Sequence, residues 1–220
     1  MNYDLLLRII FGAPAFALAI MIHESAHAWA AHRLGDPTAK NMGRISLNPV
    51  RHFDPMGAIV YVALMVITRG SFAIGWAKPV PINTYNFRDR RRDFMLSSLA
   101  GPAANLVQAF LWALALGIYL RLQRSGPGFD PVQFMILFGV IINVVLAVFN
   151  LIPIPPLDGS RVLGWMLPER YAYHLDRMER YGFLILMGLL FFVPGLLQAL
   201  MSAVGYPLIE FFLKLAQALV

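Results

Sequence analysis

Apolar stretches long enough to cross a lipid bilayer dominate the chain. A membrane-spanning helix needs about 20 predominantly apolar residues. The first candidate runs from Leu5 to Ala31, and Phe94–Leu120 and Pro131–Leu157 are each 27 residues long without a charged side chain. These three stretches predict three membrane spans.

A fourth apolar stretch, near the C-terminus, is interrupted. Tyr181–Ile209 has no charge over 29 residues, but Pro194-Gly195 and Gly205-Tyr206-Pro207 break it. Together with the tail it predicts either a helical hairpin or one span followed by an interfacial helix. Glu210 and Lys214 lie four residues apart, a pairing that suits an interfacial surface.

The region between the first two spans contains a shorter apolar stretch. Pro55–Thr68 has 14 uncharged residues, which is typical of a re-entrant or interfacial segment. In the following stretch, Gly75–Asn83, Pro79 and Pro81 exclude a helix interior and a central strand. This stretch therefore predicts an extended, β-like edge segment.

The composition indicates an all-α polytopic membrane protein. Hydrophobic residues make up 59% of the chain, charged residues 14%, and mean hydropathy is +0.63. Because cysteine is absent, thiolate metal sites are excluded and a zinc ion must be held by histidine and carboxylate. The net charge of +6 could suggest nucleic acid, but in a membrane protein it indicates cytoplasmic loops. We therefore expect the bilayer, and no nucleic acid, as a partner.

The positive charges predict the orientation in the membrane. Of 18 Lys and Arg residues, 14 lie in Arg33–Arg51, Arg69–Arg92 and Arg161–Arg180. The positive-inside tendency assigns these stretches to the cytoplasm and the N-terminus to the outside. This assignment requires Pro55–Thr68 to enter the membrane and return. We expect a multi-pass protein of a prokaryotic cell (inner) membrane.

The sequence His23-Glu24-Ser25-Ala26-His27 carries the main candidate chemistry. Positions i and i+4 of a helix share one face, so His23 and His27 can bind one metal ion. Glu24 lies about 100° around the helix, where it can contact a water on the metal without ligating it. This short pattern also occurs by chance, but ionisable side chains at membrane depth are costly and usually functional.

A catalytic zinc ion usually has three protein ligands, so one more is required. His32 is rotated about 140° from His27 and is better read as an interfacial histidine. His52, like His174, lies in a polar loop and is predicted to be solvated. Asp54 precedes a proline and is predicted to cap a turn or helix. Asp93 belongs to the charged cluster before the second span.

Asp158 is the strongest candidate for the third ligand. It ends the sequence Asn150-Leu-Ile-Pro-Ile-Pro-Pro-Leu-Asp158-Gly159, in which three prolines must unwind the helix. Irregular backbone at this depth is tolerated where it lines a cavity, and that cavity can meet His23 and His27. The alternative is that Asp158 is an ordinary N-cap of a helix that starts at Gly159.

Three motifs together resemble those of the site-2 protease family of intramembrane metalloproteases. They are the HExxH at His23–His27, Gly101-Pro-Ala-Ala-Asn105, and the Asn150–Gly159 sequence; Gly75–Pro81 also resembles the segment between that family's first two core helices. The resemblance implies a three-helix catalytic core. To this core we expect the chain to add C-terminal helices, without the PDZ or CBS domains that some members carry. We accordingly expect a catalytic core over residues 1–168 and C-terminal helices over 169–220.

The resemblance also implies roles for individual residues. One Zn²⁺ per chain would be held by His23, His27 and Asp158, with Glu24 as general base and a water as nucleophile. Asn150 would donate to the substrate carbonyl or its oxyanion. In the second motif, Asn105 would contact helices or substrate, and Gly101 would allow close helix approach.

The expected function is an intramembrane zinc endopeptidase that cleaves transmembrane segments of other proteins, with its site towards the cytoplasmic face. One alternative is a membrane metal-binding or transport protein that uses the same His and Asp residues. It would require polar residues along several spans and a His-rich loop, which the sequence lacks. Another is a prenyl-protein protease, whose third ligand would be a glutamate.

Overall fold

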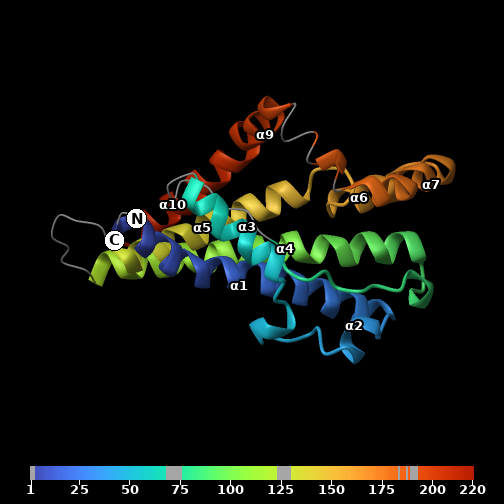
Figure 1. Cartoon of the computed structure of the whole chain (residues 1–220), viewed down its shortest axis with the longest axis horizontal. Coiled ribbons are helices and arrows are strands. Elements are labelled where there is room, and N and C mark those ends of the chain that lie inside the picture. Colours follow the sequence, from blue (N-terminus) through green and yellow to red (C-terminus); the bar gives the residue numbers. More distant parts are fainter. Residues whose placement is uncertain (1–2, 68–75, 123–129, 183, 187, 189–192) are drawn as a thin grey trace.

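The described part of the chain is helical, without a strand. The computed structural model describes residues 3–67, 76–122, 130–182, 184–186, 188 and 193–220. The long helices are α1 (Tyr3–Leu34), α4 (Arg90–Leu122) and α5 (Pro131–Asn150), which run side by side (Figure 1). The shorter elements are α2 (Thr38–Asn41), η1 (Pro49–Arg51), α3 (Pro55–Ile67), η2 (Thr84–Asn86), α6 (Gly159–Met166), α7 (Glu169–Met178), η3 (Glu179–Tyr181), α9 (Pro194–Leu200), η4 (Met201–Gly205) and α10 (Tyr206–Gln217).

Four helical stretches among the described residues are long and apolar enough to cross a membrane, so the chain is a multi-pass membrane protein. Three of them, Leu5–Leu34, Arg90–Leu122 and Pro131–Asn150, confirm the predicted spans. The predicted third span was too long, since the helix ends at Asn150 and irregular backbone follows before the three prolines. The fourth, Gly195–Gln217, joins α9, the π-helical η4 and α10 into one span.

Small side chains let the long helices approach one another. Ala109 and Ala113 of α4 pack against Val140 and Val144 of α5, and Phe212 of α10 closes this cluster. Glu210 and Lys214 pair on α10 at 2.7 Å, as their spacing predicts. The C-terminal span thus packs on the same helices as the predicted core, and the predicted boundary at residue 168 stays a prediction.

The helix α3 packs against α1 beside the core. Phe16 of α1 stacks on Tyr61 of α3 with ring centroids 4.5 Å apart, and Met65 is buried in the same cluster. With 13 residues, α3 is about 20 Å long, which is less than the thickness of the hydrocarbon core of a bilayer.

The chain before α3 is bonded to the chain that follows it. The backbone N–H of Lys78 donates to the carbonyl oxygen of His52 at 2.9 Å. A Cβ atom added to Gly57, in the first turn of α3, would lie 2.0 Å from the carbonyl oxygen of Trp76. Residues 52–57 and 76–78 therefore lie side by side. Residue 75 of the predicted β-like segment lies outside the described residues, and residues 76–83 form no strand.

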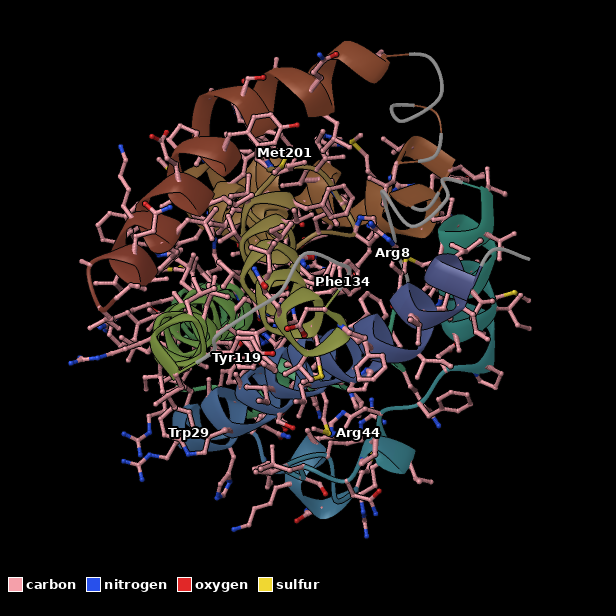
Figure 2. The ribbon with its side chains drawn as sticks, turned by 90° about the vertical axis from the view of Figure 1, so that its left-hand side faces the viewer. Arg8, Trp29, Arg44, Tyr119, Phe134 and Met201 are labelled. Carbon is pink, nitrogen blue, oxygen red and sulfur yellow. The ribbon has the colours of Figure 1, made fainter. Side chains whose placement is uncertain are left out.

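Two buried charged side chains hold the segment after residue 76 in place. The Arg44 guanidinium, on the side of α1 where the α1–α3 connection lies, donates to the carbonyl oxygens of Lys78 and Pro79 (Figure 2). The carboxylate of Asp36 accepts hydrogen bonds from the backbone N–H of Asn83 at 2.7 Å and the side-chain amide of Asn86 at 2.8 Å.

The hydrogen bonds also set the charge state of Asp36. Burial raises the pKa of the Asp36 carboxyl, but the hydrogen bonds from Thr38, Asn86 and Asn83 outweigh this effect and lower it below its ordinary value. The charged form is therefore the one that the surrounding donors stabilise.

Candidate metal centre

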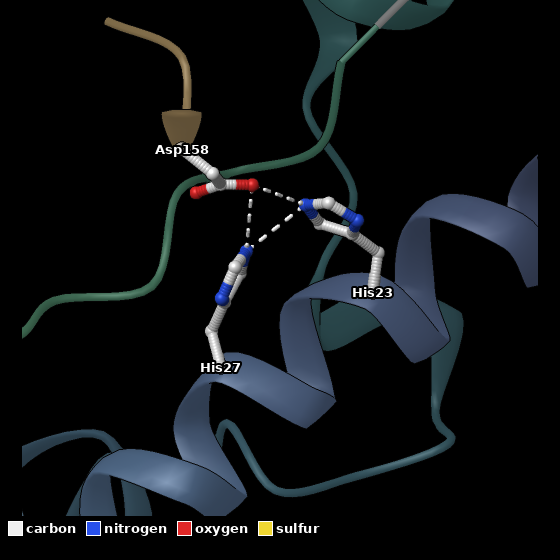
Figure 3. Close-up of side chains that lie close together, drawn as sticks. All are labelled: His23, His27 and Asp158. Carbon is white, nitrogen blue, oxygen red and sulfur yellow. Dashed lines mark hydrogen bonds and ion pairs between the residues drawn. The ribbon is translucent and has the colours of Figure 1, made fainter. Parts of the chain in front are cut away.

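Two histidines of α1 and a carboxylate from a distant part of the chain converge at one point (Figure 3). The Nε2 atoms of His23 and His27 are 2.9 Å apart. Oδ2 of Asp158 lies 3.3 Å from the first and 3.4 Å from the second. The structure therefore brings together the three residues that the sequence predicts as metal ligands.

The other ring nitrogen of each histidine has its own partner. Nδ1 of His27 lies 2.8 Å from the carbonyl oxygen of Ser97 in α4. Nδ1 of His23 lies 2.5 Å from Oδ1 of Asn105, about two turns further along α4. Because both partners are acceptors, the hydrogen of each neutral imidazole lies on Nδ1, and each Nε2 presents a lone pair.

The three converging atoms are therefore all acceptors. Oδ2 of Asp158 has no hydrogen-bond partner among the described residues, although it is buried. Three lone pairs at about 3 Å repel one another unless a cation lies between them. Ligand atoms that share a tetrahedral zinc ion at about 2.0–2.1 Å lie about 3.3 Å apart. The donor set and its spacing thus fit zinc.

The break in the chain after α5 delivers the carboxylate to this position. The helix ends at Asn150, and the irregular segment 151–158 turns back so that Asp158 faces α1 (Figure 3). A Cβ atom on Gly159 would lie 2.2 Å from the carbonyl oxygen of Leu151, so this close return requires glycine. The side chain of Asp158 makes no helix-capping bond on α6, which argues against the alternative that it is an ordinary cap.

Gly101 leaves space for the imidazole rings. A Cβ atom added there would lie 2.4 Å from Nε2 of His27 and 2.6 Å from Cε1 of His23. The sequence prediction assigned Gly101 to close helix approach. The structure adds the reason: α4 passes directly over the two rings, and a methyl group would displace them.

Glu24 faces the same cavity as the ligand group. A cavity of about 690 Å³ is lined by His23, His27, Asp158, Glu24 and Asn150, together with the extended segment. Oε2 of Glu24 accepts a hydrogen bond from the backbone N–H of Val80 at 3.0 Å. The carboxylate is therefore oriented by the segment that Arg44 and Asp36 hold.

Asn150 also lines this cavity, at the end of α5. Its amide nitrogen donates to the carbonyl oxygen of Leu146 at 2.9 Å, which uses one of its two N–H groups. The second N–H is available for a further acceptor in the cavity.

The prediction that His52 is solvated was wrong. Its side chain is 2% exposed, Nε2 lies 2.9 Å from the carbonyl oxygen of Ser46, and the Ser25 hydroxyl is 3.3 Å away. The composition of this loop predicted exposure to solvent. In the structure the loop folds against α1, and Ser25 and Ser46 supply the polar partners of His52. His52 is not part of the ligand group.

The remaining candidates also lie outside the ligand group. Nε2 of His32 lies 3.0 Å from Nζ of Lys40, in agreement with its predicted rotation away from the site. Asp54 accepts the backbone N–H of Gly57 and caps α3, as predicted. Asp93 is buried in the first turn of α4, where its carboxylate accepts a backbone N–H. His174 is exposed as predicted, but it lies in helix α7 and not in a loop.

The chain is similar to known proteins over most of its length. Residues 127–193 match the model for "Peptidase family M50". The chain is 35% identical to "Putative zinc metalloprotease YwhC" of Bacillus subtilis over 185 residues, which cover 80% of this chain and 78% of that protein. The chain therefore belongs to peptidase family M50, the site-2 protease family.

Other relatives carry names of the same kind. "Putative zinc metalloprotease Rip2" of Mycolicibacterium smegmatis is 33% identical over 177 residues, 79% of this chain and 63% of its own length. The similarly named MJ0611 of Methanocaldococcus jannaschii is 40% identical over 68 residues, 31% of this chain and 32% of its own. The chain thus spans less than two thirds of these two relatives. No solved structure matches it.

The close contact at Gly101 generates a prediction. Gly101→Ala should weaken zinc binding roughly 5- to 150-fold, because overpacking of this kind costs about 1–3 kcal/mol and here falls on the ligands. The dissociation constant is measured by competition with a chromophoric chelator. Gly195→Ala is the matched control, since an added Cβ there meets nothing within 4 Å. Equal zinc affinity in both variants would contradict the assigned role of Gly101.

Proposed function

We propose that this chain is an intramembrane zinc endopeptidase that cleaves transmembrane segments of other membrane proteins. One observation carries the proposal. Three acceptor atoms, from His23, His27 and Asp158, meet beside the carboxylate of Glu24 within a bundle of membrane-spanning helices. Ionisable groups in that setting are usually functional. Membership in a family whose relatives are named zinc metalloproteases supports the same chemistry.

The chain's own residues supply binding and proton transfer. His23, His27 and Asp158 would hold the zinc ion. When bound, zinc polarises the scissile carbonyl and lowers the pKa of a water, so that the water can lose a proton and attack near neutral pH. Glu24 would accept the proton of that water and deliver it to the leaving amine. Its hydrogen bond from Val80 keeps the carboxylate turned towards the cavity.

Asn150 would stabilise the negative charge that develops on the carbonyl oxygen. Its amide group lies at the wall of the cavity, and one N–H remains for this purpose after the bond to Leu146. Preorganised donors of this kind contribute most where water is excluded.

The walls of the cavity suit an apolar chain as substrate. The side chains of Phe16, Ile20, Ile142, Leu146 and Phe149 line it along α1 and α5. On another side run Trp76, Ala77, Pro79, Val80 and Ile82, in the segment without helix or strand. A substrate helix must unwind to expose its peptide bond, and this segment would hold the unwound chain by main-chain pairing.

A metal transporter is not favoured. Transit of an ion needs ligands along the length of the spans. The part of the chain that the structure describes offers one group of metal ligands, His23, His27 and Asp158.

The role of Glu24 is tested by the near-isosteric change Glu24→Gln. The glutamine side chain can still accept the N–H of Val80, and residue 24 is not a metal ligand, so zinc should stay bound. The amide, however, cannot take the proton of the water. We expect cleavage of a transmembrane test substrate to fall by roughly 10²–10⁴-fold. Asn150→Ala should lower the rate by roughly 10²–10³-fold. Turnover of the zinc-loaded Glu24→Gln protein at a rate within tenfold of the unchanged chain would exclude this mechanism.

We propose that α3 (Pro55–Ile67) enters the membrane without crossing it, with the metal site towards the cytoplasm. The hydrogen bond between His52 and Lys78 supports this path, because its two ends cannot lie on opposite faces of a bilayer about 30 Å thick. The basic stretches on both sides of the segment favour the cytoplasm.

The absence of cysteine makes this topology directly testable. Val50→Cys, Tyr85→Cys and Leu122→Cys introduce thiols at positions that are 79%, 78% and 77% exposed. In intact cells, a membrane-impermeant thiol reagent should label only the cysteine at position 122. The other two should react after the membrane is opened. Labelling at position 85 but not at 50 in intact cells would mean that the segment crosses the membrane.

A further inference from the structure

Two buried asparagines connect α4 and α5 behind the metal centre. Asn105 and Asn143 are both 0% exposed and lie inside membrane-spanning helices. Their amide groups are bonded to each other, with Nδ2 of Asn105 donating to Oδ1 of Asn143 at 2.8 Å. Burying polar groups in a membrane-spanning bundle costs free energy, and such groups usually have a role in function. The sequence prediction placed Asn105 in a motif but did not single out Asn143.

The hydrogen bonds run in one direction through this pair. Nδ2 of Asn143 donates to the carbonyl oxygen of Gly139 at 2.9 Å, which turns its Oδ1 towards Asn105. Nδ2 of Asn105 faces that oxygen and also the carbonyl oxygen of Ala19 at 3.2 Å. Reversing either amide would place oxygen against oxygen at one or two contacts. The orientation of Asn105 is therefore fixed by two acceptors.

The fixed orientation of Asn105 determines which ring nitrogen of His23 carries the hydrogen. With its nitrogen committed to Asn143 and Ala19, Asn105 must present Oδ1 to Nδ1 of His23, 2.5 Å away. Nδ1 then carries the hydrogen, and Nε2 is left with a lone pair directed at His27 and Asp158. Partners of this kind orient a histidine ligand and raise its basicity.

We propose that Asn143 is a positioning residue of the metal centre, which acts through Asn105 to hold His23 in the tautomer that binds the ion. This inference rests on the proposed zinc site and identifies the polar groups behind one of its ligands. His27 needs no such pair, because its partner is a backbone carbonyl, which is an acceptor by nature.

A third buried amide distinguishes this role from simple helix packing. Gln108 lies on the same helix as Asn105, is 6% exposed, and donates to the same carbonyl oxygen of Ala19 at 3.4 Å. It makes no recorded bond to a metal ligand. Gln108 therefore shares the packing environment of Asn105 without the connection to His23, and it serves as the matched control.

The test measures zinc dissociation constants of the full-length protein in detergent, by chelator competition, together with the melting temperature. Asn105→Leu should weaken binding roughly 10- to 100-fold, and Asn143→Leu roughly tenfold, at the lower end of the range known for such partners. Gln108→Leu should leave the dissociation constant within about threefold, in line with its lack of contact with a ligand.

Asn105→Asp separates positioning from packing. Its carboxylate still accepts the hydrogen of His23 but can no longer donate to Asn143 and Ala19. We expect zinc affinity at or above that of the unchanged chain, together with a lower melting temperature. A merely structural role would weaken binding in Asn105→Asp and Asn105→Leu alike.

These measurements distinguish failure of the positioning role of Asn143 from failure of the proposed zinc site. If the unchanged protein binds no zinc, the metal site itself is wrong. If it binds zinc and Asn143→Leu behaves like Gln108→Leu, the zinc site stands and the positioning role is overturned. If Asn105→Asp loses zinc as strongly as Asn105→Leu, the role of the accepted hydrogen is overturned.

Discussion

Three lone pairs that face one another at about 3 Å are the constraint around which this structure is organised. Both Nδ1 atoms face acceptors, so in the neutral rings the Nε2 lone pairs of His23 and His27 point at Oδ2 of Asp158. In an apolar surrounding their repulsion is poorly screened. A cation at the centre of such a group relieves this repulsion, and the donor set fits the proposed zinc ion.

Much of the surrounding architecture follows from assembling this group. α5 must end at Asn150 so that the chain can turn back and present Asp158 to α1. Gly159 allows that return, and Gly101 lets α4 cover the two rings while its backbone carbonyl at Ser97 holds His27. The helices therefore meet closely where the ligands lie.

The sequence predicted the spans and the ligand set because both are local patterns. Uncharged stretches define the helices, and the i, i+4 spacing of His23 and His27 defines a shared face. Asp158 followed from the prolines before it and from the family motif. The rotation that removes His32 from the site was likewise a matter of helix geometry.

Other parts could not be predicted, because they depend on contacts between distant residues. Asn143 lies 38 residues from Asn105, and no spacing rule connects them. His52 lies in a polar loop whose burial against Ser25 depends on the fold of the whole connection. The bond between Val80 and Glu24 joins residues 56 positions apart. The end of the third span was misplaced because apolar composition continues past the last helical residue.

Metal analysis of the purified protein and its Asp158→Ala variant tests the central claim most directly. The unchanged chain should contain about one zinc ion, from the three-ligand count. Asp158→Ala should lose it, while His32→Ala, a histidine on the same helix that lies outside the ligand group, should retain it. Full zinc retention in Asp158→Ala, or no zinc in the unchanged chain, would contradict the account.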